Sequence, residues 1–188
     1  MANNSGGRVE KKDEDLIREA AAGDREAFRT LFARYERPIL NFAHRLGARP
    51  DEAEEVVQET FLKILRHGAR YDPSRPARPW IYTVAANLCR ARFVKYSRAL
   101  LTAADLDRRQ GNGHAVPALA HASEIGEKVR AAVAALSEEQ RVVFVLARYQ
   151  GLDYTEIAEA VGIPVGSVKS RMYRAVRVLR ERLKGLLP

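Results

Sequence analysis

The residues best suited to binding a negatively charged partner lie near the C-terminus, where positions 166–184 carry seven Lys/Arg and one acidic residue. A short neutral-to-acidic segment begins at Asp153, and the turn GIPV at 162–165 separates it from the basic stretch. Asp153 and Glu156 have the spacing of a capping box, while Gly162 suits the left-handed residue that ends a helix. This pattern predicts a helix-turn-helix, whose turn fixes the angle at which the second helix enters a DNA major groove.

The basic helix is amphipathic, so one of its faces is available to DNA. Its apolar residues recur three and four positions apart, as in a helix packed on a core: Val168, Met172, Val176 or Ala175, Leu179 and Leu183. On the opposite side, residues near the helix start should reach base edges and phosphates, and the later arginines should meet phosphates or solvent. The candidate DNA contacts are Ser167, Lys169, Ser170, Arg171, Tyr173, Arg174 and Arg177. The alternative is a helical hairpin with a basic, solvated face.

Residues typical of catalysis or metal binding do not form a recognisable pattern. The four histidines do not have metal-ligand spacing with one another or with Cys89. They are His44, His67, His114 and His121. The sequence has no Walker loop, no Gly-x-Ser-x-Gly motif and no paired acids beside a plausible nucleophile. We therefore expect no enzymatic activity, no catalytic residues, no metal and no cofactor. We expect Cys89 to be a small buried residue.

The net charge of +8 is distributed unevenly over the 188 residues. Residues 13–65 hold twelve acids and eight bases, whereas residues 66–98 hold eight bases and one acid. Residues 99–125 are nearly neutral, and residues 126–188 have a net charge of +4. Two separate basic stretches favour a polyanionic partner, although runs of charge often are only solvated faces.

The sequence also bears on the compartment. No apolar run approaches the roughly 18 residues of a membrane span, so we expect no membrane insertion. The short polar N-terminus does not have the features of a signal peptide, and a single cysteine fits a reducing environment. We expect a cytoplasmic protein.

The periodicity of every ordered stretch is helical, which predicts an all-α fold. We expect two small helical domains joined by a flexible linker, with the helix-turn-helix in the C-terminal one. The expected boundaries are a disordered tail at 1–12, a first domain at 13–98, a linker at 99–124 and a second domain at 125–188.

Several residues predict where helices begin and end in the first domain. Asp24 should cap a long helix that bends at Pro38 and ends at Gly47. Asp51 should start the next helix, whose inward residues are Val56, Val57, Phe61, Ile64 and Leu65. After a loop at residues 68–78, Pro79 should be the first residue of a further helix with Ile81, Val84, Ala85 and Leu88 inward.

Three segments, in two modules, resemble one known family. LSEEQRVVFVLARYQGLDYTEIAEAVGIPVGSVKSRMYRAVRVLRERL, at 136–183, is similar to the fourth region of bacterial sigma factors. DEAEEVVQETFLKILRH and RPARPWIYTVAANLCRARFVK, at 51–67 and 75–95, are similar to their second region. Only a linker lies between them, which is the form of the extracytoplasmic-function (ECF) group of the sigma-70 family. The resemblance covers residues 13–98 and 125–184.

The resemblance implies three contact surfaces. The acidic helix at 51–66 would bind core RNA polymerase, through Asp51, Glu52, Glu55, Gln58, Glu59, Phe61 and Leu62. The basic stretch at residues 66–98, which we call the basic strip, would capture the unpaired strand of the minus-10 promoter element. Its expected contacts are Arg70, Arg75, Arg78, Trp80, Tyr82, Asn87, Arg90 and Lys95. Asn87 matches a position that helps to recognise a flipped base, and one of Trp80 and Tyr82 is expected in the core. The helix-turn-helix would read the minus-35 duplex.

The residues support parts of this scheme independently. Five acids and no base at 51–60 can face a basic protein groove but not DNA. A linker of about 26 residues extends at most roughly 90 Å, enough for two DNA elements about two turns apart. The resemblance also implies an anti-sigma factor that holds the protein inactive. The alternative function is a stand-alone helix-turn-helix regulator that binds duplex DNA without polymerase.

Overall fold

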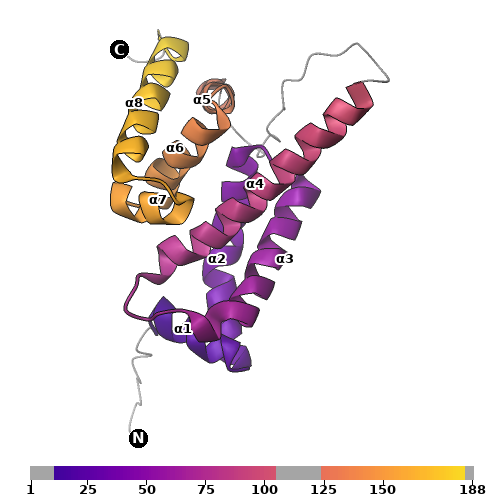
Figure 1. The fold of residues 1–188 in the computed structure, drawn as a ribbon, viewed down its shortest axis with the longest axis vertical. Helices are drawn as coiled ribbons and strands as arrows, with labels where there is room; N and C mark the ends of the chain where they lie inside the picture. Colours follow the sequence, from indigo (N-terminus) through magenta and orange to yellow (C-terminus); the bar gives the residue numbers. More distant parts are fainter. Residues whose placement is uncertain (1–10, 105–123, 185–188) are drawn as a thin grey trace, which may run out of the picture.

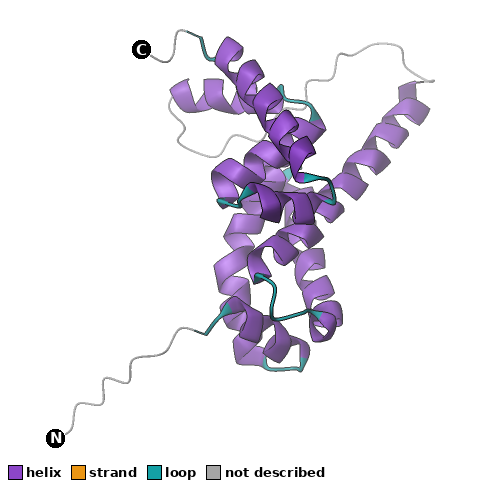
Figure 2. Ribbon diagram, turned by 60° about the vertical axis from the view of Figure 1, so that its left-hand side comes forward, coloured by secondary structure: helices purple, strands orange, loops and turns teal. Residues whose placement is uncertain are grey.

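The structure is a computed structural model that describes residues 11–104 and 124–184, with side chains described for 11–92 and 124–184. All regular elements in these ranges are helical (Figure 2), which confirms the expected all-α fold. They are α1 (Asp13–Ala21), α2 (Arg25–Leu46), α3 (Pro50–His67), the short 3₁₀ helix η1 (Gly68–Arg70), α4 (Ala77–Ala104), α5 (Glu124–Ala134), α6 (Glu138–Gln150), α7 (Tyr154–Val161) and α8 (Val165–Arg182). We call α1–α4 the N-terminal module and α5–α8 the C-terminal module.

The expected capping signals are present. The Asp24 carboxylate accepts hydrogen bonds from the backbone N–H groups of Glu26 and Ala27, at 2.8 and 3.1 Å. Gly47 ends α2 with φ of 104°, a left-handed conformation that favours glycine. Asp153 and Glu156 form a reciprocal capping box at the start of α7, and Gly162 ends that helix with φ of 70°. These local signals fix the lengths of α2 and α7 without help from tertiary contacts.

Other helix boundaries differ from the expectations. The third helix begins at Pro50 rather than Asp51, and the fourth begins at Ala77 rather than Pro79. The Ala77 N–H donates to the Glu14 carboxylate at 2.8 Å, so a residue of α1 satisfies the start of α4. At its other end α4 continues to Ala104, because residues 99–104 are mostly Ala and Leu and favour helix. Residues 99–104 and Glu124, all expected in the linker, are therefore helical, and linker residues 105–123, like residues 1–10 of the expected tail, lie outside the described residues.

The N-terminal module is a bundle in which α2, α3 and α4 lie alongside one another and α1 crosses one end (Figure 1). Three phenylalanines join α2 to α3. The ring centroids of Phe32 and Phe61 are 4.7 Å apart, and those of Phe28 and Phe61 are 5.8 Å apart. Close aromatic pairs of this kind stabilise a helix pair beyond their buried area.

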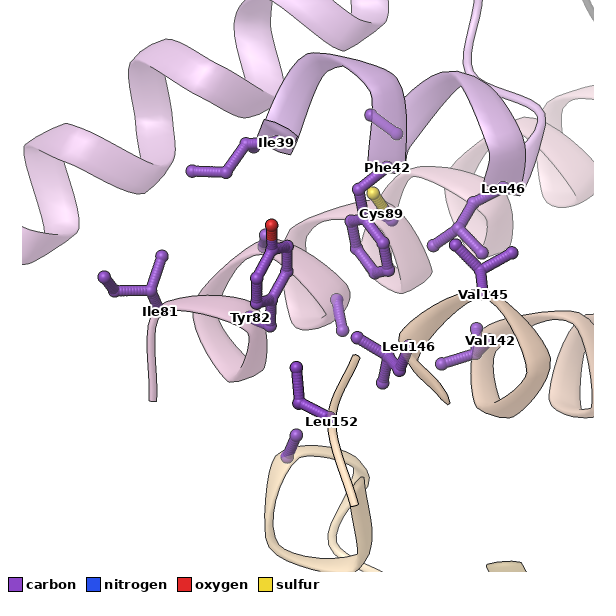
Figure 3. Packing of buried hydrophobic residues seen from close by; sticks show 14 of the residues in the cluster. Ile39, Phe42, Leu46, Ile81, Tyr82, Cys89, Val142, Val145, Leu146 and Leu152 are labelled. Atoms are coloured by element: carbon purple, nitrogen blue, oxygen red, sulfur yellow. The ribbon is translucent and has the colours of Figure 1, made fainter. Parts of the chain in front are cut away.

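The two modules share a continuous core. Figure 3 shows side chains of α2 and α4, including Phe42 and Tyr82, beside Val142, Val145 and Leu146 of α6 and Leu152. Leu146 is fully buried and Leu152 is 4% exposed, so both residues of the C-terminal module pack as tightly as ordinary core residues. The structure is thus a packed arrangement of two modules, in which α6 and α7 cover parts of α2 and α4.

Candidate nucleic-acid interface

Helix α8 is the best-formed candidate DNA surface. Val168, Ala175 and Leu179 are buried and fix the inner face, whereas Val176 is 41% exposed, which settles the alternative of Ala175 or Val176 at this position. Two of the expected DNA contacts, Ser167 and Arg171, are half-buried. The other five are exposed: Lys169, Ser170, Tyr173, Arg174 and Arg177. Tyr173, at 71%, is the most exposed large apolar side chain of the described residues. The outer face of α8 therefore presents cations, a hydroxyl and an aromatic ring together.

One expected DNA contact already has a partner within the protein. The Arg171 guanidinium lies 3.1 Å from the Glu139 carboxylate, and only 21% of the Arg171 side chain is exposed. Glu139 belongs to the first turn of α6, where an acidic residue also favours the helix N-terminus. Arg171 must exchange this carboxylate for DNA before it can contact a base, whereas Arg174 has no ion pair among the described residues.

The acidic face of α3 is formed largely as the sequence predicts. Asp51, Glu55, Gln58 and Glu59 are exposed, and Leu62 is 48% exposed. Glu52 is half-buried because its carboxylate accepts from the Arg49 backbone N–H at 2.8 Å and caps the helix. These residues recur three and four positions apart, so they share one exposed side of α3, which is polar except for Leu62.

Phe61, in contrast, does not belong to this surface. Its side chain is 3% exposed and packs against Phe28 and Phe32. The helical period already placed Phe61 inward with Val57 and Ile64, and the packing follows that period. The expectation that Phe61 contacts a partner is corrected: Leu62, one position later, is the exposed apolar residue.

A cation from the basic strip turns toward this acidic face. The Arg92 guanidinium forms ion pairs with Glu55 and, at 2.9 Å, with Glu59. Burial alone would lower the pKa of Arg92, but the hydrogen bond to Glu55 and the charges of both carboxylates outweigh it and raise that pKa. By its position in the sequence Arg92 belongs to the basic strip. In the structure it instead orients the carboxylates of Glu55 and Glu59.

The expected minus-10 strip is divided in the structure. Arg70, Arg75, Arg78 and Asn87 are exposed, and Arg90 is half-buried. Trp80 is half-buried and packs on Tyr71, with ring centroids 5.0 Å apart. The side chain of Lys95 lies outside the described residues. The exposed members surround the first turns of α4 and the loop before it, which leaves a basic surface with one amide.

Tyr82 is the clear exception in this strip. Its side chain is 1% exposed, and its hydroxyl donates to the Gln150 amide oxygen at 2.5 Å. Burial raises the pKa of Tyr82 to about 12. The ring also packs on Phe42, with centroids 5.4 Å apart (Figure 3). In this arrangement Tyr82 cannot reach DNA, which corrects its place among the expected DNA contacts.

The burial of Tyr82 follows from the position of α4, which packs on α2 and α3 within its own module and on α7 of the C-terminal module. Ile81, Ala85 and Leu88 are buried, as the inner stripe predicts, but Tyr82, Ala86 and Cys89 are buried as well. A helix apolar on one stripe packs on one partner, and a broader apolar surface requires a second partner. The sequence signal for this second packing surface is the set of apolar residues that flank the inner stripe, Tyr82, Ala86 and Cys89.

Two further contacts hold the modules together. The half-buried Arg141 guanidinium donates to the Leu46 carbonyl of α2 at 3.0 Å and, within its own module, to the Leu136 carbonyl at 2.9 Å. Burial lowers the pKa of Arg141, and its Nε atom has no hydrogen-bond partner among the described residues. The guanidinium of Arg45 lies 4.2 Å from the centre of the Tyr149 ring. The modules are therefore joined by polar contacts as well as by the shared apolar core.

Features of other protein classes are missing from the described residues. There, no group of three or more His, Cys, Asp or Glu side chains is placed to hold a metal ion. Cys89 is buried, and burial raises the pKa of its thiol to about 12, which keeps it in the unreactive protonated form. None of the helices in the described ranges is long and apolar enough to cross a membrane.

Comparisons with known proteins agree with this geometry. The sequence model of the Sigma-70 region 2 family matches residues 31–99, and that of Sigma-70, region 4 matches residues 126–179. The ECF RNA polymerase sigma factor SigL of Mycobacterium tuberculosis is 33% identical over 89% of this chain and 94% of its own length. The RNA polymerase sigma-H factor of Pseudomonas aeruginosa is 29% identical over 95% and 97%, respectively.

Solved structures show the same relationship. CnrH, in complex with the cytosolic domain of CnrY, has a TM-score of 0.67 and 26% identity over 91% of this chain and 96% of its own. The sigma factor RpoE of Bartonella quintana, in complex with the anti-sigma factor NepR, has a TM-score of 0.69 and 25% identity over 84% and 97%. With both regions present in order and relatives matched over nearly their whole length, the chain belongs to the ECF group of the sigma-70 family, the sigma factors of bacterial RNA polymerase.

Proposed function

We propose that this sigma factor binds core RNA polymerase through the acidic face of α3 and reads promoters with α8 and the strip around Asn87. In this scheme α8 enters the minus-35 duplex, and the strip captures the unpaired minus-10 strand. The observation that carries the proposal is the separation of charge within one chain, with an exposed acidic face on α3 and exposed basic faces on α8 and α4. The protein supplies recognition and positioning, and the polymerase supplies the chemistry.

The polymerase contact is argued from Glu55 and Glu59. Both carboxylates are about half exposed and both pair with Arg92, which holds them in a fixed orientation. Oriented, partly solvated charges favour specific association with a partner of opposite charge. Leu62, exposed between them and the end of the helix, adds an apolar contact. We propose that Asp51 and Gln58 lie at the rim of the same surface.

The two DNA contacts require the modules to separate. Two promoter elements two helical turns apart lie about 70 Å from one another, since one turn spans roughly 34–36 Å. In the structure α4 and α7 are in direct contact, and Tyr82 is bonded to Gln150. We therefore propose that the packed arrangement is a resting state, and that binding to polymerase and promoter selects an open state.

An anti-sigma factor is the partner we propose for the resting protein. The structural relative RpoE is described in complex with the anti-sigma factor NepR, and CnrH in complex with the cytosolic domain of CnrY. A partner that covers the acidic face of α3 or the basic face of α8 in this chain would block polymerase or DNA. We place the activity in the cytoplasm, at the nucleoid, where polymerase and promoter DNA meet.

Run-off transcription with purified core polymerase and a randomised promoter library tests the proposal. We expect transcripts that depend on this chain and share a minus-35 and a minus-10 sequence. Co-purification with core polymerase separates this function from the stand-alone regulator. A chain that footprints a duplex alone and does not bind core polymerase would support the regulator and contradict the proposal.

A further inference from the structure

A cavity of about 630 Å³ lies where the two modules meet. Its walls come from α1, α2 and the start of α4 in the N-terminal module, and from the end of α6 in the C-terminal module. We call it the interface cavity. Ligand cavities typically measure about 300–1,000 Å³ and occur often between domains. Of the residues that line it, only Arg78 belongs to the polymerase and DNA contacts proposed above.

Hydrogen-bond donors outnumber acceptors in the walls of this cavity. Arg37 and Arg78 line it and make no hydrogen bond or ion pair with the described residues. The amide oxygen of Gln150 is taken by Tyr82, while its amide nitrogen makes no hydrogen bond there either. A guanidinium offers five donors and no acceptor, so these groups need an acceptor from a ligand or from water.

The carboxylate in the wall does not neutralise these donors. Asp13 is the only acidic residue among those that line the cavity. One of its oxygens accepts from Arg34 at 2.5 Å, and the other accepts from the Tyr35 hydroxyl. Arg45 is held over the ring of Tyr149, which turns a fourth guanidinium toward the same wall. The remaining field in the cavity is positive and favours an anion.

We propose that the interface cavity binds a small phosphate-bearing anion, with a diphosphate or triphosphate group seated between Arg37, Arg78 and Gln150. Guanidinium groups bind phosphate oxygens through paired hydrogen bonds, which an amide N–H supplements. The phosphate group is the shared chemistry, and it can be inorganic or carried by a nucleoside. Buried polar side chains at the base of the cavity, Tyr82 and Gln150, give the site a fixed wall rather than a purely solvated one.

Such a ligand would hold the modules together, because both of them contribute to the site. A ligand that binds only the packed state raises the ratio of packed to open protein about hundredfold when its concentration is 100 times the dissociation constant. This consequence rests on the proposed function, in which the open state engages polymerase. A phosphate-bearing anion would then act as an inhibitor of holoenzyme assembly without touching α3 or α8.

Isothermal titration of the full chain with inorganic pyrophosphate tests the site, at constant ionic strength so that screening is equal in all samples. We expect one pyrophosphate per chain. Arg37→Ala should weaken binding at least tenfold, and Arg29→Ala, an exposed arginine of the same helix outside the cavity, should leave it unchanged. Equal binding by the two variants, or equal losses, would overturn the proposal. Small-angle scattering should show a more compact chain with pyrophosphate, and unchanged dimensions would overturn the locking role.

Further titrations identify the source of the phosphate. Equal affinity for pyrophosphate and ATP indicates recognition of the phosphate group alone, and tighter binding of ATP indicates a nucleotide; both outcomes support the site. Adenosine binding as tightly as ATP would contradict it. A short random duplex that displaces pyrophosphate from Arg29→Ala and Arg37→Ala alike would mark the wall as DNA surface and also contradict it. These measurements contain no polymerase or promoter, so their failure leaves the proposed function intact.

Discussion

Helices α8 and α4 both present basic residues to solvent, but the rest of the molecule covers them to different degrees. The outer face of α8 is open along its length, and Arg174 and Arg177 are free of intramolecular ion pairs in the described ranges. One side of α4, in contrast, lies under the C-terminal module, where Tyr82 bonds to Gln150. The surface that we propose for the minus-35 element is therefore fully open in this structure, whereas the helix that we propose for the minus-10 strand is covered on one side.

The difference indicates how the proposed DNA contacts could be ordered. A duplex element needs a preformed helix, because base edges in the major groove are presented in a fixed array. A melted strand becomes available later, because unpairing costs a few kcal/mol. The exposed α8 can act first, and the covered side of α4 is released only when polymerase and DNA favour the open chain. The following changes test each side of this comparison.

The largest effect is expected on the acidic face of α3, which belongs to neither of the basic surfaces compared above. Glu55→Lys combined with Glu59→Lys reverses the charges that we assign to core polymerase, and it should abolish holoenzyme formation through a loss of about 2–5 kcal/mol or more. The melting temperature should fall modestly, because the reversal breaks both ion pairs of Arg92, which is 24% exposed, and places two cations beside it. A pull-down with core polymerase measures the loss. The matched control is Glu124→Lys with Glu127→Lys on α5, and equal core binding by the two double variants would refute the α3 assignment.

A smaller effect is expected on α8. Arg174→Ala should weaken minus-35 binding by about 1–3 kcal/mol if this guanidinium contacts a guanine edge. Arg171→Ala should lose less net affinity, because Arg171 must first leave Glu139. If both arginines contact only phosphates, affinity should fall equally on all sequences and the salt slope should shrink by about one. Quantitative footprinting distinguishes these outcomes, and an intact minus-35 footprint in both variants would contradict the recognition face.

The covered side of α4 is tested by Tyr82→Phe. The change removes one hydroxyl and leaves the Gln150 oxygen without its partner, so we expect a loss of about 1 kcal/mol in the stability of the packed arrangement. Small-angle scattering should show a larger average dimension, and thermal melting should begin earlier. Tyr173→Phe on the exposed face of α8 is the control. A variant with unchanged dimensions and melting would show that this hydrogen bond does not hold the modules together.

The same tyrosine predicts a response to alkaline pH. Burial raises the pKa of Tyr82 to about 12, above the ordinary value of 10, so the packed state favours the protonated hydroxyl. The corresponding stability is fully present below pH 10 and is lost as the pH rises toward 12. Tyr71, whose pKa burial also raises to about 12, contributes in the same window. Melting temperatures between pH 9 and 12 should therefore fall less steeply in Tyr82→Phe than in the unchanged chain, and equal slopes would contradict this role.

Helix ends and buried helix faces are the parts of the structure that follow from the sequence. The capping residues Asp24, Asp153 and Gly162 act within a few positions of themselves, so the helices they bound could be predicted locally. The inner face of α8 follows from its period for the same reason. The helical period correctly predicts that Phe61 is buried, whereas its position within the acidic segment wrongly suggests a contact with a partner. A periodic pattern determines which side of a helix packs inward, and it does so better than membership of a functional stretch.

Contacts between distant segments could not be predicted in this way. The pairing of Arg92 with Glu55 and Glu59 joins α4 to α3, and the bond from Arg141 to the Leu46 carbonyl joins α6 to α2. No local pattern encodes such pairs, because they depend on how whole helices pack. The packing of the two modules on one another was missed for this reason, since a linker long enough to separate the modules also allows them to meet.

The smallest expected effect on total transcription comes from Asn87→Ala, and it concerns the part of α4 that remains exposed in the packed state. An amide both donates and accepts, so it can read the Watson–Crick edge of a base that has left the stack. The variant should lower transcription from promoters with the preferred minus-10 base, by about tenfold or less, which is within roughly 1.4 kcal/mol. Promoters with that base changed should be affected less.

The same run-off assay on mismatched bubble templates separates reading from melting. Asn87 reads the captured strand, so the base preference of the unchanged protein should persist on the bubble and disappear in Asn87→Ala on both templates. A Trp80→Ala defect in melting, by contrast, should be largely rescued by the bubble. If Asn87→Ala keeps the original preference on matched and bubble templates alike, Asn87 is an ordinary surface residue of α4. The reading of the open strand would then have to come from the exposed arginines around it, Arg75 and Arg78.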